Sequence, residues 1–323
     1  MVDSLGTPPP ILLLVFNRPE QTQQAINAIL RERPSRVYVS GDGPRAHVPA
    51  DQQGVERVWD LIHATPWDCE LIERRINSNV GCGSAVRSAL DWFFEHEAYG
   101  FIVEDDVELA PGALALATHL FDVGARDPHV GNITVFNTVP ERHLSHPQAS
   151  YRRSLFSASQ GWGTWAKTWR ACPQTPEHWR SWLPESALTQ LGGVELMRRW
   201  SGILDRDVLA HQHPTDFTWD FTWQAHLWAT QPISLVSNVN LIRNTGFSSD
   251  ATFSADVPKW WPMESGTWSE PFIAPPTSDR DTRADRWEGR SRYAISRWYS
   301  IRRSLAERLP GLTARYRKFR FED

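Results

Sequence analysis

Cysteine is scarce in this chain of 323 residues, and its arrangement excludes two classes of protein. The three residues, Cys69, Cys82 and Cys172, are odd in number, widely spaced and form no C-x-x-C pair. Disulfide-rich secreted domains and zinc-binding domains use closely spaced cysteines, and the 11 histidines show no zinc spacing either. The sequence therefore predicts reduced thiols in a cytoplasmic protein.

Long apolar runs and an excess of positive charge are also missing. The longest apolar run near the N-terminus, residues 11–16, has six residues, which is too short for a membrane-spanning helix or the core of a signal peptide. A net charge of −4 and a pI near 6.3 disfavour nucleic acid as a partner. A chain of this length can form one large domain or two modest ones.

Tryptophan, by contrast, is abundant. The chain has 17 tryptophans, and 14 of them lie from Trp162 onward. Indole rings pack in cores and also stack on flat ligands such as sugar rings. For any single tryptophan, core packing is the better interpretation, so the asymmetry only suggests a sugar-binding half.

The first 135 residues alternate between short apolar runs and segments with helical periodicity. This pattern predicts strands at 11–16, 37–40, 70–74, 101–103 and 133–136, and helices from Pro19, at 55–64, at 84–96 and from Pro111. Regular alternation of strand and helix is typical of an α/β fold. We therefore expect a mainly parallel sheet flanked by helices.

Three consecutive carboxylates, Glu104, Asp105 and Asp106, directly follow the apolar run at 101–103. Their charges repel one another, and a hard cation such as Mg²⁺ or Mn²⁺ relieves the repulsion with one or two carboxylates and substrate phosphates as ligands. A solvated acidic turn that caps the following helix is the alternative. Because ligands of open α/β sheets bind beyond the carboxyl ends of strands, the position favours a metal site.

Seven short motifs follow one another between about residues 10 and 253. They are Val-Phe-Asn-Arg-Pro at 15–19, Ser-Gly-Asp-Gly at 40–43, Asn-Val-Gly-Cys-Gly at 79–83, Val-Glu-Asp-Asp at 103–106, Gly-Trp-Gly-Thr-Trp at 161–165, Trp-Asp-Phe-Thr-Trp at 219–223, and the stretch 238–252. In this order they resemble nucleotide-sugar glycosyltransferases of the GT-A (Rossmann-like) fold. The similarity is closest to bacterial haemolytic-protein-like glycosyltransferases and more distant to animal N-acetylglucosaminyltransferases of N-glycan synthesis.

The resemblance implies a domain organisation and a donor site. A GT-A domain would span 8–255, with a donor half at 8–135 and an acceptor half at 136–255, followed by an irregular segment and an Arg-rich helix over 256–323. Arg18 would hold the nucleotide, and Asp42 would read the base, usually uracil, by accepting from a ring N–H. A turn-forming role is the alternative for Asp42, and solvation on a helix surface is the alternative for Arg87 as a donor ligand. The other nucleotide-sugar positions are Phe16, Asn17, Asn79, Gly81, Glu104 and Asp105, and Asp106 would bind the metal.

The resemblance also implies a catalytic base and a sugar pocket. Asp220 matches the position of the base that deprotonates the acceptor hydroxyl, and Asp216, one helical turn earlier, is the alternative base. Residues 244–250 resemble a loop that covers the bound donor. Phe253 stands where the family often has a basic residue or histidine, so a further diphosphate ligand there is not supported. The expected pocket residues are Gly161, Trp162, Trp165, Trp219, Asn244, Gly246, Phe247 and Asp250.

The implied function is an inverting, divalent-metal-dependent transfer of a sugar from a nucleotide-diphosphate donor to a hydroxyl. A UDP-sugar is the first expectation, with GDP and dTDP as alternatives, and the acceptor would be a glycan, a glycolipid or a small molecule. A non-catalytic carbohydrate-binding protein has no need of the acidic triplet or Asp220. A sugar-nucleotide pyrophosphorylase usually has a Gly-rich basic loop after its first strand, where this chain has Phe-Asn-Arg-Pro.

Arginine dominates the last part of the chain. Residues 286–320 contain ten arginines and one lysine against Glu288 and Glu307, with apolar residues interleaved. This pattern is compatible with peripheral contact to the inner membrane face, where lipid-linked acceptors would lie. It is equally compatible with a helix that packs on the transferase domain.

Overall fold

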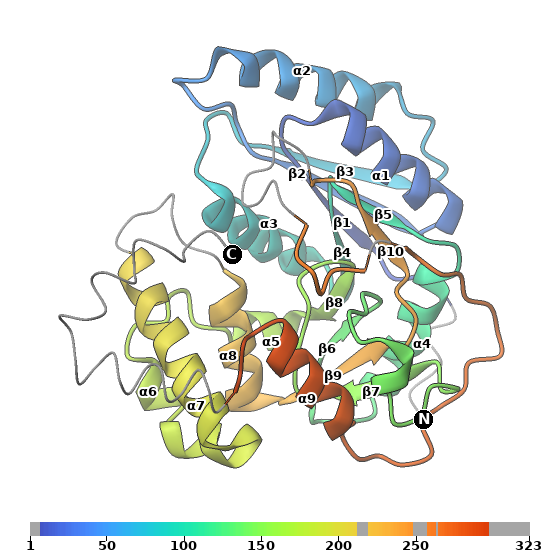
Figure 1. Cartoon of the computed structure of the whole chain (residues 1–323). Helices are drawn as coiled ribbons and strands as arrows, with labels where there is room; N and C mark the ends of the chain where they lie inside the picture. Colours follow the sequence, from blue (N-terminus) through green and yellow to red (C-terminus); the bar gives the residue numbers. More distant parts are fainter. Residues whose placement is uncertain (1–6, 212–218, 248–256, 263, 297–323) are drawn as a thin grey trace.

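A large central sheet with helices on both sides organises the molecule (Figure 1). The computed structural model describes residues 7–211, 219–247, 257–262 and 264–296. The sheet has eight strands in the order β3-β2-β1-β4-β8-β6-β9-β7, and a separate two-stranded sheet joins β5 to β10. The predicted α/β class is confirmed.

Strand and helix alternate through the first half, as the sequence predicts. The strands are β1 (Ile11–Val15), β2 (Arg36–Gly41), β3 (Glu70–Arg75), β4 (Tyr99–Glu104), β5 (Val107–Leu109), β6 (Val130–Thr134), β7 (Tyr151–Ser154), β8 (Trp162–Trp165), β9 (Ile233–Ser237) and β10 (Ile242–Asn244). The α-helices are α1 (Pro19–Glu32), α2 (Pro49–Ala64), α3 (Cys82–His96), α4 (Ala113–Gly124), α5 (Ala166–Arg170), α6 (Trp179–Trp182), α7 (Glu185–Ala210), α8 (Asp220–Thr230) and α9 (Thr282–Ser291), and η1 (Glu141–His143) is a short 3₁₀ helix.

The two halves of the sheet differ in strand direction. β3, β2, β1 and β4 are parallel neighbours, whereas β8 runs antiparallel between β4 and β6, and β7 runs antiparallel to β9. β6 and β9 form a further parallel pair. The parallel half therefore places the carboxyl ends of β1, β2 and β4 at one edge, where the predicted donor residues follow them.

Alternating side chains of β1 explain the layers. Ile11, Leu13 and Val15 enter the core cluster that contains the apolar faces of α1, α2 and α4. Leu12 points to the other face of the sheet, into the cluster formed with α3 and α8. A strand buried on both faces reads as a continuous apolar run, which is why Ile11 to Val15 shows no alternation.

The strand expected at 133–136 is displaced. β6 begins at Val130, because Val130 pairs with Ile233 of β9, more than one hundred positions away. Val135 and Phe136 are buried beyond the end of the strand, and the backbone N–H of Val135 donates to the carbonyl of Gly161 at 2.9 Å. A local pattern identifies the apolar residues but not their distant partner.

The described part of the expected 256–323 unit packs directly on the sheet domain. α9 contacts β7 and η1. The Asp281 carboxylate caps α9 and also accepts from the hydroxyl of Ser145 at 2.7 Å, and Asp285 accepts from the hydroxyl of Ser154 at 2.7 Å. The remainder of the expected Arg-rich helix, from residue 297, lies outside the described residues.

The described helices were also compared with the length and apolarity that a bilayer requires. Within the part of the chain that the structure describes, no helix is both long and apolar enough to cross a membrane.

Candidate active site

The acidic triplet sits at the tip of β4, where it meets the turn after β1. The backbone N–H of Phe16 donates to Asp105 Oδ2 at 3.1 Å, and Arg18 Nη1 donates to Asp106 Oδ2 at 3.3 Å. On the other side, the backbone N–H of Thr245 donates to the carbonyl of Asp106 at 2.7 Å. Residues that follow β1 and β10 thus hold the triplet in place. Its location at the end of β4 is the one predicted from the sequence.

The pKa of each carboxyl group in the triplet is raised, so the ionised forms are poorly stabilised here. Burial, together with repulsion from Asp106, raises the pKa of Asp105 to about 7, although Arg18 and the Phe16 N–H oppose the shift. Burial and the neighbouring carboxylates also raise the pKa of Glu104 well above its usual value. Burial raises the pKa of Asp106 against the opposing effect of Arg18 and the Asn244 side chain. A bound cation would offset this desolvation and repulsion.

A divalent cation fits the Asp106 carboxyl group. Oδ1 is buried and has no hydrogen-bond partner among the described residues, while Arg18 contacts the other oxygen. No three His, Cys, Asp or Glu side chains of the described segments converge as a metal-binding set. Protein ligands alone would therefore hold such a cation weakly, as is common where substrate phosphates complete the shell.

Asp42 organises the loop that follows β2. Its carboxylate accepts from the backbone N–H of Gly43 at 2.8 Å and of Val80 at 3.1 Å, and from Asn79 Nδ2 at 2.8 Å. Burial raises the pKa of Asp42 even so. The backbone N–H of Gly81 also stabilises the carboxylate, so the loop itself supplies about as many donors as a carboxylate accepts, in line with the turn-forming alternative. Gly81, at φ +85°, lets the same loop turn into α3.

Cys82, the first residue of α3, lies near several of the predicted site residues. The thiol is exposed, yet burial of its surroundings and the charges of Glu104, Asp220, Asp42 and Asp105 raise its pKa to about 12. The strand-tip carboxylates, the residue after β2 and the predicted base therefore all lie within electrostatic reach of one thiol. Four of the residues predicted to bind the donor or to act as the base therefore lie near one another.

Asp220 is the first residue of α8, and it has an unpredicted acidic neighbour. Asp207 on α7 is 4% exposed and accepts from the hydroxyl of Thr222 at 3.0 Å. Burial raises the pKa of Asp207 to about 7, with the charge of Asp220 adding to the shift. Asp216, the alternative base, lies outside the described residues.

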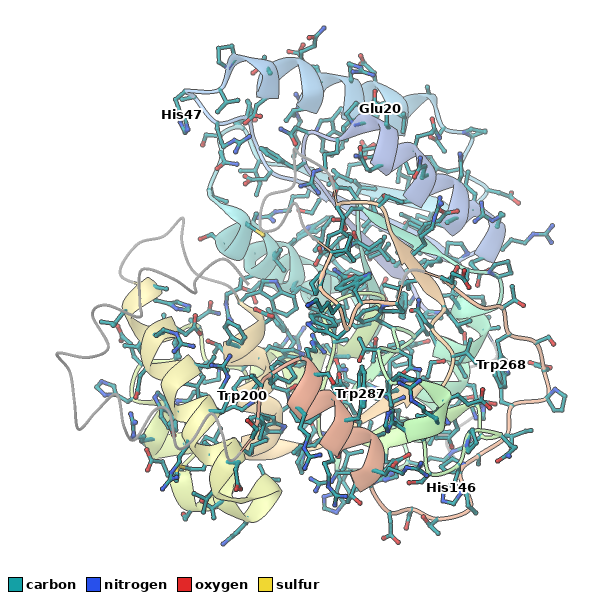
Figure 2. All side chains as sticks on the ribbon, in the orientation of Figure 1. Glu20, His47, His146, Trp200, Trp268 and Trp287 are labelled. Atoms are coloured by element: carbon teal, nitrogen blue, oxygen red, sulfur yellow. The ribbon has the colours of Figure 1, made fainter. Side chains whose placement is uncertain are left out.

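The expected tryptophan wall is mostly core. The ring of Trp162 is fully buried and stacks on Trp219 at 5.3 Å, and Trp223 packs at 5.6 Å from Trp162. Trp162 and Trp219 are therefore packed in the core and do not present a free aromatic face. Trp200 on α7 is also fully buried, in the cluster of α6, α7 and α8 (Figure 2).

Trp165 is not brought to the site. It pairs with Tyr99 at the start of β4, five positions before Glu104, and its ring packs on Phe121 at 5.3 Å. The antiparallel direction of β8 is the reason, because it carries the end of the Gly-Trp-Gly-Thr-Trp motif away from the strand tips. Gly161, at the near end of the motif, has φ +52°, and a Cβ there would lie 2.7 Å from Ile242.

Two predicted donor residues have structural partners instead. Asn17 Nδ2 donates to Asp51 Oδ1 at 2.6 Å, which ties the turn after β1 to α2. Arg87 Nη2 donates to the carbonyl of Pro173 at 2.8 Å, and its guanidinium lies 5.2 Å from the ring of Trp169. Arg87 is buried, so the alternative of a solvated helix residue is wrong, but its partners lie at the junction of α3 and α5.

The segment after β10 packs against Asp106, the predicted metal ligand. The Asn244 Oδ1 atom accepts from the backbone N–H of Gly246 at 2.8 Å. A Cβ on Gly246 would overlap Asp106 Oδ2, so only glycine permits this approach. The ring of Phe247 lies 4.8 Å from Trp261. Asp250 lies outside the described residues.

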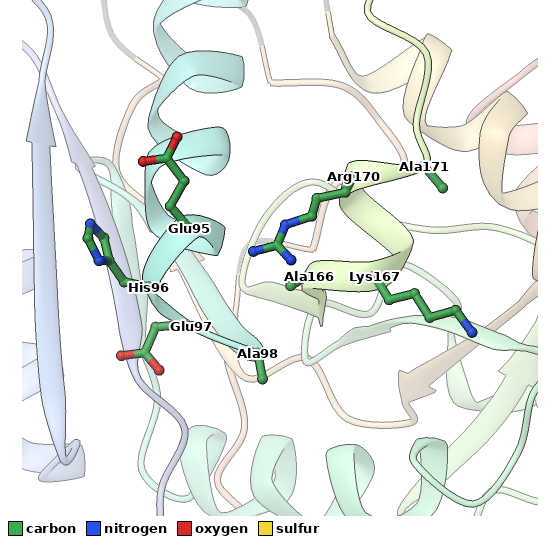
Figure 3. A pocket seen from close by; sticks show the side chains of 8 residues that line it. All are labelled: Glu95, His96, Glu97, Ala98, Ala166, Lys167, Arg170 and Ala171. Carbon is green, nitrogen blue, oxygen red and sulfur yellow. The ribbon is translucent and has the colours of Figure 1, made fainter.

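A further cavity of the described chain lies away from the acidic triplet. It has a volume of about 740 Å³ and is an open groove between the end of α3 and α5, lined by residues such as Glu95, Lys167 and Arg170 (Figure 3). Ala98 and Ala166 place it at the amino end of β4, opposite the acidic triplet. Its lining brings no group toward the reacting residues.

Four residues near Asp220 were not among the expected site residues. The charge of Asp220 acts on Cys82 and Asp207, and Arg292 and Tyr293 line a small pocket with Asp220. Cys82 stands within a quoted motif, and its position at a helix start beside Gly81 was the available signal. Arg292 lies within the Arg-rich run, and charge spacing alone does not distinguish an arginine that packs on the domain from the nine others. Asp207 carried no signal, since an acid on a helix is ordinarily solvated.

Comparison with known proteins gives a distant likeness. No family model and no curated protein matches the sequence. Among solved structures, a mannosyltransferase from Pyrobaculum calidifontis in complex with GDP-Man and Mn²⁺ is 14% identical at a TM-score of 0.35, and the match covers 73% of this chain and 59% of that one. HddC from Yersinia pseudotuberculosis complexed with GMP-PN is 9% identical at a TM-score of 0.31, and the match covers 51% of this chain and 80% of that one.

Mouse xyloside xylosyltransferase 1 in its apo form is 11% identical at a TM-score of 0.34, over 67% of this chain and 80% of that one. This chain thus matches only about three fifths of the length of the archaeal mannosyltransferase. Identities and scores in this range establish neither an activity nor a substrate, so function has to be argued from the site itself.

Proposed function

We propose that this protein is a GT-A-type glycosyltransferase that inverts the anomeric carbon and requires Mn²⁺ or Mg²⁺. It would transfer a sugar from a nucleotide diphosphate, UDP first, to a hydroxyl of a glycan, lipid-linked or small-molecule acceptor. The observation that carries the proposal is the contact of Asp105 and Asp106, at the end of β4, with the Phe16 N–H and the Arg18 guanidinium, which follow β1.

Each group then has a defined task. Asp106 Oδ1 would bind the cation, which supplies charge neutralisation at the diphosphate of the donor. Arg18, beside the same carboxylate, would bind the phosphates, and Asp42 would receive the base in exchange for one of its hydrogen bonds within the loop. Asp220 would accept the proton of the attacking hydroxyl.

The two rival functions are less well supported. A plain sugar-binding protein needs exposed aromatic faces, but Trp162, Trp219 and Trp223 are at most 5% exposed. A pyrophosphorylase needs a phosphate-binding loop after the first strand, but Pro19 starts α1 directly there. Neither alternative uses a carboxylate at Asp220.

Two binding experiments test the proposal without knowledge of the acceptor. Calorimetry should show that UDP binds more tightly with Mn²⁺ than without it. Because the raised pKa of Cys82 leaves little thiolate, iodoacetamide treatment is run at about pH 9 and followed by mass spectrometry over time. UDP with Mn²⁺ should slow alkylation of Cys82 but not of Cys69, which precedes the amino end of β3 and serves as the internal control.

A screen of UDP-, GDP- and dTDP-sugars for slow metal-dependent hydrolysis then identifies the donor. A protein that binds none of these nucleotides, with or without metal, is not a nucleotide-sugar transferase. Binding that leaves the alkylation of Cys82 unchanged would place the donor site elsewhere.

A further inference from the structure

Arg292 brings a positive charge from the C-terminal segment to the site. It follows α9 directly, and its Nη1 atom donates to the carbonyl of Ser157 at 3.0 Å and to Glu288 Oε1 at 3.2 Å. Its guanidinium lies 5.0 Å from the ring of Tyr293 and 5.6 Å from that of Trp260. Backbone, carboxylate and ring contacts therefore fix the position of this side chain.

Arg292 and Tyr293 share a small pocket with Asp220. Other lining residues are Ser157, Ser159, Gln224, Trp200, Phe221 and Trp223. Gln224 Oε1 already accepts from both the backbone N–H and the hydroxyl of Ser157, at 2.7 and 2.9 Å. The charged residues of the lining are thus Asp220 and Arg292, and the charge of Asp220 acts on the Arg292 guanidinium.

Several of the described groups on which the charge of Asp220 acts are acidic. Its charge acts on Glu104 from β4, on Asp207 from α7 and on the Cys82 thiol from α3, and it adds to the burial that raises the pKa of each of them. From the C-terminal segment, it acts on the Tyr293 hydroxyl and on Arg292. Arg292 is the cation of this set. An attraction of this kind has to offset the repulsion if Asp220 is to accept a proton.

Glu288 does not neutralise Arg292 by itself. The same carboxylate lies 3.8 Å from Nη2 of Arg152, a fully buried arginine that also donates to the carbonyl of Ser237 at 2.9 Å. Glu288 is thus shared between two guanidinium groups, Asp281 and Asp285 act on Arg152 as well, and Arg292 is the arginine of this cluster that also lines the pocket of Asp220. The nearby Asp285 is paired with Arg280 at 3.0 Å.

We propose that Arg292 is a positioning residue for Asp220, holding the base ionised between Glu104 and Asp207 from across the pocket. The inference rests on the proposed function, in which Asp220 is the base. It also assigns the segment after residue 256, outside the expected transferase domain, to the acceptor side of the site.

Titration of the Asp220 carboxyl group tests the proposal independently of turnover. Full-length protein is labelled at the aspartate carboxyl carbons, and the Asp220 signal is assigned in the ¹³C spectrum by its loss in Asp220→Asn. Arg292→Gln should raise the Asp220 midpoint by about half a unit or more, since removal of a nearby cation disfavours the carboxylate. Arg292→Lys and the control Arg290→Gln, an exposed arginine of the same helix, should leave it near the wild-type value.

The pH profile of sugar-nucleotide turnover is the second readout. On the acidic limb, Arg292→Gln should turn over donor about threefold more slowly for each half-unit rise, with the rate recovered at higher pH and in Arg292→Lys. Should Arg292→Gln fail to fold, Arg292→Met keeps an uncharged stem against the rings of Trp260 and Tyr293 and serves in its place.

The outcomes separate the two ideas. A wild-type midpoint for Asp220 in the neutral variants overturns the role of Arg292, whether or not the protein turns over a sugar nucleotide. A raised midpoint with no turnover of any donor by the wild type confirms the electrostatic contact but overturns the proposed function, and with it the role of Arg292 in catalysis.

Discussion

At the scale of single residues, Asp106 is the decisive position for metal dependence. Its unpartnered Oδ1 atom is the observation that motivates the test. Asp106→Asn should bind Mn²⁺ and donor poorly and should lower turnover on the order of 10³-fold or more, because leaving-group stabilisation of several kcal/mol is lost. Turnover is compared across Mn²⁺ concentrations with Asp68→Asn, a remote surface variant, as the control. Full wild-type activity in EDTA would remove the metal from the proposal.

Replacement of Asp220 should change a different kinetic quantity from replacement of Asp106. An amide keeps the shape of the side chain but accepts no proton, so Asp220→Asn should bind donor normally and lose roughly 10²–10⁴-fold in kcat. Calorimetry with UDP and Mn²⁺, together with steady-state kinetics, measures the two effects. If Asp216→Asn is the inactive variant while Asp220→Asn remains active, the base lies one helical turn earlier than proposed.

The sequence predicted the position of a residue correctly where that position depends on its neighbours in the chain. The acidic triplet was placed correctly at a strand tip because an apolar run and three acids are adjacent in the chain. Trp165 was placed wrongly, because the antiparallel insertion of β8 between β4 and β6 depends on partners that are distant in sequence. Arg292 was missed for the same reason, since its neighbours Ser157 and Asp220 come from other parts of the chain.

At the scale of elements, α9 depends on a buried carboxyl group whose charge is costly. Asp285 accepts from the hydroxyl and backbone N–H groups at 154–155 and pairs with Arg280, yet burial outweighs these contacts and raises its pKa to about 7 from 3.8. Between about pH 4 and 7 the folded state therefore binds more protons at this group than the unfolded state. Its contribution to stability is present below that window and is lost as the pH rises through it.

Asp285→Asn should remove this pH dependence. The free energy of unfolding of the wild type, relative to the variant, should fall between pH 5 and pH 8 by on the order of 1–3 kcal/mol, because only the wild type must ionise a buried group. Urea unfolding at the two pH values measures it, and Asp279→Asn, at an exposed position before the same helix, is the control. A constant difference between variant and wild type would show that Asp285 is ionised at pH 5.

At the scale of the whole molecule, α9 and the turn after it belong to the folded body, which changes how membrane contact should be tested. A truncation after Asp285 would remove Glu288, Arg292 and Tyr293 and disturb the site itself. The appropriate boundary is Ser296, the last described residue.

We expect the segment after Ser296 to bind anionic membranes. Arg302, Arg303 and Arg308 lie among Ile301 and Leu305, and each basic residue near anionic lipid is worth about 1 kcal/mol. Replacing the three arginines by glutamine in the full chain should therefore weaken binding on the order of 100-fold. Co-sedimentation with phosphatidylserine-containing vesicles at low salt measures this, and neutral vesicles and high salt are the controls, because both remove the electrostatic attraction. Equal sedimentation of variant and wild type would exclude these charges as the anchor, and recovery of both in the supernatant would leave a glycan or small molecule, rather than a lipid-linked sugar, as the expected acceptor.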